Sequence, residues 1–209
     1  YQHFRSKEDL VCALTLETME TISELMSKVE RFDACSRDKA FAWSFMILLL
    51  AVLHPDYITT QLILEVQDID EKTSKERMDR VRAMHVELRD RVLSIMKLGV
   101  GEGTLLLKDE NEQEGLLFGL VALSYGALVT GTDPEDKRLL YMKTDLGEGL
   151  IRNFNALLDG YGWRPLSAER DIDAIRKRIL QEVFRDESVA CLERMSEGRT
   201  NVERRKDNA

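Results

Sequence analysis

A stripe of residues at helical spacing constrains the fold of this chain more than any other feature of its sequence. Between positions 74 and 99, six residues recur at alternating steps of three and four: Met78, Val81, His85, Leu88, Val92 and Ile95. These steps place all six side chains on one face of an α-helix, whereas a β-strand would divide them between two faces. The opposite face is charged, so the spacing predicts a long helix with one buried and one solvated side.

The rest of the chain repeats this helical period, and no stretch shows the alternation of a strand. Residues 41–53 are apolar nearly all round, which is typical of a central, buried helix. Residues 172–190 carry isoleucine, valine and alanine on one face and predict a final helix. The sequence therefore predicts an all-α fold with several helices.

Composition narrows the class of protein further. The 209 residues are 44% hydrophobic and 33% charged, and this balance is typical of a soluble globular chain. The sequence shows no apolar run long enough to cross a bilayer and no signal peptide. Cys12, Cys35 and Cys191 are odd in number and lack the spacing of metal ligands, which favours reduced thiols. We expect a cytoplasmic protein.

The sequence contains no set of residues typical of a catalytic site. It contains no nucleophile elbow, no phosphate-binding glycine loop and no pair of histidines at metal-binding spacing. Three glycines at positions 99, 101 and 103 lie between predicted helices without a preceding strand, so they do not fit a dinucleotide site. We expect no enzymatic activity, no metal and no cofactor.

The first ten residues carry the most specific functional pattern. Ser6 is suited to cap a helix, with Asp9 three residues later as the partner of a capping box. The helix N-terminus would attract anions, and several nearby side chains can donate hydrogen bonds to phosphate oxygens. Composition alone favours the alternative, an ordinary solvated chain start. The donors are Tyr1, Gln2, His3, Arg5 and Lys7.

This segment, Tyr-x-His-Phe-x-Ser-Lys-Glu-x-Leu, resembles a motif of the tetracycline-repressor (TetR) family of bacterial transcription regulators. In that family it joins the end of the DNA recognition helix to the next helix. The resemblance implies that Tyr1, His3 and Lys7 contact operator phosphates and that Phe4 and Leu10 pack the DNA-binding domain. Most of the family's helix-turn-helix precedes this motif, so we expect the chain to hold only the end of that domain.

The resemblance also implies a domain organisation. Residues 1–31 would be the end of the helix-turn-helix domain and a connecting helix. Residues 32–163 would form the ligand-binding and dimerisation domain. Residues 164–209, a helical extension with a charged tail, lie beyond the family pattern, and their role stays open. The family's last two regulatory helices form a four-helix bundle with a second subunit, which would place Asn111–Thr130 and Lys143–Leu158 in a homodimer interface.

The expected function is transcriptional repression, with operator DNA binding controlled by a small, largely apolar effector. A net charge of −8 does not suit a protein whose whole surface binds nucleic acid, but it is compatible with a small basic end on an acidic body. The alternative is an all-α dimeric module that binds a ligand or a protein and never engages DNA.

A set of aromatic and apolar residues could line the effector pocket, because ligand sites are mostly apolar with a few polar groups. His85 interrupts the stripe and could anchor a ligand or respond to pH. The open alternative is ordinary core packing, with His85 satisfied by a backbone carbonyl. The candidate pocket residues are Trp43, Phe45, Met46, Tyr57, Met84, His85, Leu88 and Tyr125.

Overall fold

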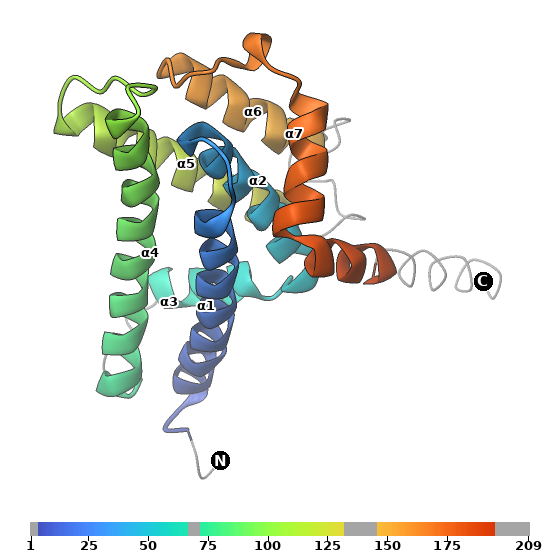
Figure 1. The fold of residues 1–209 in the computed structure, drawn as a ribbon. Coiled ribbons are helices and arrows are strands. Elements are labelled where there is room, and N and C mark those ends of the chain that lie inside the picture. The colour runs from blue at the N-terminus through green and yellow to red at the C-terminus, as the bar shows by residue number, and fades with distance from the viewer. Residues whose placement is uncertain (1–3, 67–71, 132–145, 195–209) are drawn as a thin grey trace.

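The computed structural model describes residues 4–66, 72–131 and 146–194. All regular elements in these ranges are helical, which confirms the all-α prediction (Figure 1). Among these residues no single helix has the length and hydropathy needed to cross a membrane. The α-helices are α1 (Lys7–Arg31), α2 (Ser36–Leu53), α3 (Tyr57–Val66), α4 (Lys75–Gly101), α5 (Glu110–Gly131), α6 (Leu146–Gly160) and α7 (Ile172–Arg178).

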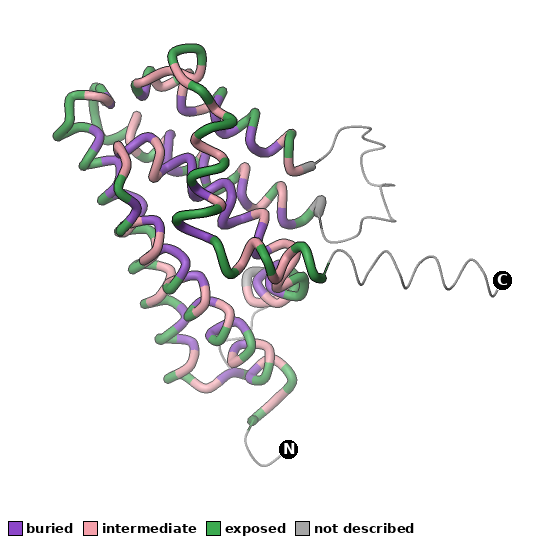
Figure 2. The backbone as a smooth tube through the Cα atoms, turned by 45° about the vertical axis from the view of Figure 1, so that its right-hand side comes forward, coloured by how far each residue is buried: buried purple, intermediate pink, exposed green. Residues whose placement is uncertain are grey.

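Helix α2 is the centre of the fold, as its apolar composition predicted. Most of its residues are buried, including Phe41, Ala42 and Phe45. It packs against α1, α4, α5 and α6, so it has neighbours on nearly every side. In Figure 2 the buried positions follow the inward side of the surrounding helices and the exposed positions follow their outer side.

Helices α1 and α4 lie side by side and run in the same direction (Figure 1). The predicted stripe of α4 faces inward: Met78, Val81, Val92 and Ile95 are all buried. Arg91 of α4 ties the pair together by donating hydrogen bonds to Glu30 Oε1 at 2.7 Å and to Ser27 Oγ at 2.7 Å. The prediction of a long helix with one buried face is confirmed.

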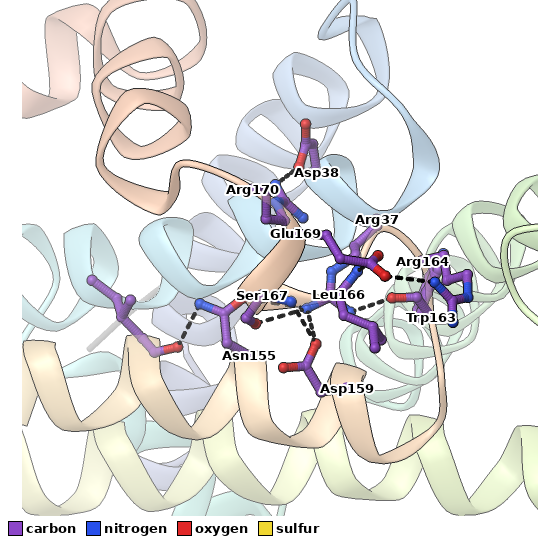
Figure 3. A network of polar contacts seen from close by, with 11 residues as sticks. Arg37, Asp38, Asn155, Asp159, Trp163, Arg164, Leu166, Ser167, Glu169 and Arg170 are labelled. Carbon is purple, nitrogen blue, oxygen red and sulfur yellow. Dashed lines mark hydrogen bonds and ion pairs between the residues drawn. The ribbon is translucent and has the colours of Figure 1, made fainter.

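A buried arginine fastens the segment after α6 to the start of α2 (Figure 3). Arg37 has no exposed surface. Its guanidinium donates to the Trp163 carbonyl oxygen at 2.5 Å, to Asp159 Oδ1 at 2.6 Å and to Ser167 Oγ at 3.2 Å. A buried cation is stable only when paired and hydrogen-bonded, so these contacts fix the geometry of the segment.

The predicted final helix is interrupted, which corrects the sequence expectation. Helix α7 ends at Arg178, and a π-helical turn follows over Ile179–Val183. The chain then bends at Phe184, and a further helical segment covers residues 185–194. The wider turn changes the helical phase, and Ile179, Val183 and Phe184 are all buried against the body.

Gly99 provides a test of this packing. A Cβ atom at Gly99 would lie 2.8 Å from Trp163 Nε1 and 3.0 Å from Ser36 Oγ, and the Trp163 ring is fully buried. We expect Gly99→Ala to lower the free energy of unfolding by about 1–2 kcal/mol, because the clash exceeds the gain in helix propensity. Urea denaturation measures the change.

Gly101 is the matched control, since no heavy atom lies within 4 Å of a Cβ built there. Gly101→Ala should leave the stability unchanged or raise it. Equal stability of the two variants would contradict the close packing of α4 against Trp163.

Candidate functional site

A cavity of about 260 Å³ lies between α1, α2, α3, α4 and α5. Its wall is almost entirely apolar and aromatic, with the side chains of α4 and α5 supplying most of the few polar groups. An apolar enclosure with a few polar groups is the usual form of a small-molecule site. The lining residues are Ile22, Met26, Trp43, Met46, Ile47, Leu50, Tyr57, His85, Leu88, Arg89, Val92, Leu117, Val121, Ser124, Tyr125 and Leu128.

Helical spacing decides which candidate residues reach this cavity. Of the residues expected to line a pocket, Trp43, Met46, Tyr57, His85, Leu88 and Tyr125 do so. Trp43 and Met46 line the cavity together with residues 47 and 50. Positions 43 and 47, like 46 and 50, are four apart, and 43 and 46, like 47 and 50, are three apart, so all four lie on one face of α2.

Phe45 and Met84 are not among the lining residues, which corrects that part of the expectation. Phe45 lies on another face of α2, where its ring packs edge-on against Phe41 with the centroids 5.3 Å apart. Met84 is half-buried against the core at the edge of the cavity-facing side of α4. Both side chains lie outside the helical faces that line the cavity, and both pack in or against the hydrophobic core instead.

A glutamine organises the polar side of the cavity. Gln61 of α3 is fully buried, and its Nε2 lies 2.6 Å from His85 Nε2 and 3.4 Å from the Tyr125 hydroxyl. With the amide in this orientation, Gln61 donates to the unprotonated Nε2 of His85. Sequence reasoning missed Gln61. The available signal was that Gln61 is the single amide of α3, a helix in which Tyr57, Ile58 and residues 62–64 are apolar.

Two polar atoms beside the cavity have no hydrogen-bond partner. They are the indole Nε1 of Trp43 and the amide Oε1 of Gln61, and both are buried. Nearly all buried polar groups in proteins are hydrogen-bonded, because leaving one unpaired costs about 1–3 kcal/mol. Trp43 lines the cavity, whereas Gln61 contacts the lining residues His85 and Tyr125 without being a lining residue itself. The Trp43 N–H is therefore the unmet group that belongs to the cavity wall.

The N-terminal motif lies at the far end of α1 from this cavity. Tyr1 and His3 lie outside the described residues, and Lys7 is exposed at the first position of α1. Phe4 and Leu10, expected in the core of a DNA-binding domain, are 36% and 39% exposed. Arg77 lies over the Phe4 ring, 5.0 Å from its centroid.

Asp9 joins this end of α1 to the start of α4. Its fully buried carboxylate accepts hydrogen bonds from the backbone amides of Arg5 and Ser74, each at 3.0 Å, and forms an ion pair with Arg77. Ser6 caps α1 as predicted by accepting from the Asp9 amide at 3.1 Å, and its hydroxyl donates to the Lys72 carbonyl. Burial alone would raise the pKa of Asp9, but the hydrogen bonds from Arg77 and the two amides lower it to about 2.

Helices α1 and α4 therefore contribute residues both to the cavity and to the contacts around Asp9. Helix α1 carries Asp9 near its start and lines the cavity with Ile22 and Met26. Helix α4 begins at the Asp9 contact and lines the cavity through residues 85–92.

Comparisons with known proteins leave the site to be interpreted from its geometry. No protein-family model, no curated protein and no solved structure matches the chain. Within the ranges that the structure describes, no cluster of three or more His, Cys, Asp or Glu side chains could hold a metal ion. The candidate site is therefore an apolar cavity with one polar side.

The Asp9 contact makes a prediction about stability and pH. The folded-state pKa lies below the unfolded value of 3.8, so the contact stabilises the fold above about pH 4 and loses that contribution as the pH falls to about 2. We expect Asp9→Asn to lower the free energy of unfolding by about 2 kcal/mol at pH 7. The difference from wild type should shrink between pH 4 and pH 2.

Denaturant titrations at several pH values measure this difference. Asp79→Asn is the control, because Asp79 is half-exposed on α4 and forms only long ion pairs with its helix neighbours. It should have little effect at any pH. A pH-independent loss of stability in Asp9→Asn would contradict the assigned role of the Asp9 charge.

Proposed function

We propose that this protein is a ligand-responsive DNA-binding regulator of the TetR type. The observation that carries the proposal is that one helix pair, α1 and α4, links the apolar cavity to the N-terminal motif. The motif resembles the family's operator-contacting segment, and Lys7 is exposed there as a phosphate contact requires. The cavity supplies a place for the effector.

The proposed mechanism is a coupling between these two sites. A ligand that pushes α1 and α4 apart at the cavity would tilt the N-terminal end of α1, because the Asp9 contacts hold that end to α4. Symmetric dimers read DNA half-sites about 34–36 Å apart, so a small tilt in each subunit spoils simultaneous engagement. Differential ligand affinity for the two arrangements would then control DNA binding.

An exposed apolar strip on α5 supports the proposed homodimer. Phe118 is 74% exposed, and Val129, on the same face of the helix, is 39% exposed. Helix α5 packs on α6 along its other side, so the two helices could meet their copies in a four-helix arrangement.

The alternative remains a ligand- or protein-binding module that does not engage DNA. The net charge of −8 favours it, because an acidic body repels the phosphate backbone. The two proposals share the cavity and the dimer, so they differ only in whether the N-terminal segment binds DNA.

Lys7 tests the DNA-binding half of the proposal in the full-length natural protein. Bound sequences are first selected from a random pool of duplex DNA, and their affinity is measured at several salt concentrations. Lys7→Ala should weaken binding to all sequences alike and reduce the salt slope by about one, because a phosphate contact releases counterions without reading bases.

Lys97→Ala is the matched control, since Lys97 is an exposed lysine near the opposite end of α4. It should leave both the affinity and the slope unchanged. Failure of the wild-type protein to enrich any sequence would favour the module that does not engage DNA.

Phe118 tests the proposed dimer. We expect Phe118→Asp to convert the dimer to a monomer, because a buried unpaired carboxylate would stand in the middle of the interface. Sedimentation velocity measures the oligomeric state. Val86→Asp places the same charge at a 57%-exposed valine on the outer face of α4, and it should leave the dimer intact. A dimer that survives in Phe118→Asp would contradict this interface.

A further inference from the structure

The unmet polar atoms beside the cavity define what its ligand must offer. The Trp43 indole N–H needs an acceptor, and the free end of the Gln61 amide needs a partner. Turning the amide over would place its oxygen against His85 and Tyr125 and leave its NH₂ group unmet instead. One end of the amide therefore lacks a partner in either orientation. A hydroxyl group suits both cases, because it can donate and accept.

The charges around the cavity exclude an ionic ligand. Among the described residues that line the cavity, Arg89 is the only lysine, arginine, aspartate or glutamate, and it is already paired with Glu114. Both side chains of this pair are about half exposed, so the pair lies at the outer edge. A ligand carboxylate would lie among apolar walls without a counter-ion, which is strongly unfavourable.

The volume limits the size of the ligand. An apolar cavity of about 150 Å³ accommodates benzene. The present cavity, at about 260 Å³, has room for a compact molecule of about two fused rings. Its walls combine aromatic rings with the flexible side chains of Met26 and Met46, which adapt to flat apolar molecules.

We infer that the cavity binds a compact, neutral, apolar molecule carrying a single hydroxyl group. The hydroxyl would lie at the polar side formed by Gln61, His85 and Tyr125 or at the Trp43 indole, and the apolar remainder would fill the space between α1, α2, α4 and α5. This ligand class rests on the proposed function, since it describes the effector of the proposed regulator.

Three probes of matched skeleton test the inference by isothermal titration calorimetry. They are 1-naphthol, 1-methylnaphthalene and 1-naphthoate, which carry a hydroxyl, a methyl and a carboxylate at the same ring position. We expect 1-naphthol to bind at least about tenfold more tightly than 1-methylnaphthalene, because only the hydroxyl meets the buried polar atoms. We expect 1-naphthoate to bind no more tightly than 1-methylnaphthalene.

Two conservative variants test which side chain causes the preference for 1-naphthol over 1-methylnaphthalene. Trp43→Phe keeps the aromatic ring and removes the N–H, and Gln61→Met keeps the side-chain length and removes the amide. At least one of them should reduce the preference for 1-naphthol to about threefold or less, while affinity for 1-methylnaphthalene is retained. Gln181→Met, at an exposed position outside the cavity, is the control and should keep the full preference. Circular dichroism confirms that each variant is folded.

The outcomes separate this inference from the proposed function. Equal affinities for 1-naphthol and 1-methylnaphthalene would overturn the hydroxyl requirement, and tightest binding of 1-naphthoate would overturn neutrality. Either result would leave the cavity as a ligand site, so the regulator proposal would stand. Binding of none of the probes would overturn the ligand class itself, and the DNA-binding half of the proposal would still be decided by the Lys7 experiment.

Discussion

The structure depends on covering one helix that has almost no polar face. Helix α2 exposes little of its length to water, and burial of its apolar surface is a major favourable contribution to folding. Four other helices surround it, and Arg37 at its first turn holds the segment after α6 in place. The candidate cavity lies where α1, α4 and α5 meet α2 without filling the space between them.

The two halves of the proposed function are joined by the parallel pair α1 and α4. Arg91 clamps the pair near one end and Asp9 near the other. Ile22 and Met26 of α1 and His85 and Leu88 of α4 all line the cavity. Packed helices shift as rigid elements, so a change in their separation at the cavity is transmitted along their length. The proposed coupling needs no other path.

Local sequence patterns predicted the features that depend on one helix alone. Spacing predicted the buried face of α4, apolar composition predicted the central position of α2, and residue type predicted the Ser6 cap. Six of the eight candidate pocket residues line the cavity, but most of the lining residues were not among the candidates. Phe45 and Met84 were misplaced because the sequence does not say which face of a buried helix meets empty space.

The features that sequence reasoning missed depend on distant partners. Gln61 contacts residues 24 and 64 positions away, and Asp9 accepts a hydrogen bond from an amide 65 positions away. Arg37 reaches Trp163, which lies 126 positions along the chain. The break after α7 also escaped prediction, because tertiary packing of Ile179 and Phe184 overrides a continuous helical pattern.

The central claim is that the cavity and the N-terminal segment are energetically coupled. Coupling is reciprocal, so DNA must weaken ligand binding by the same factor by which the ligand weakens DNA binding. The most direct test is the Kd of 1-naphthol for the full-length protein, measured with and without a saturating DNA duplex that it binds. If the two sites are coupled, the Kd of 1-naphthol should be at least about fivefold higher in the presence of DNA. An unchanged Kd would contradict the coupling.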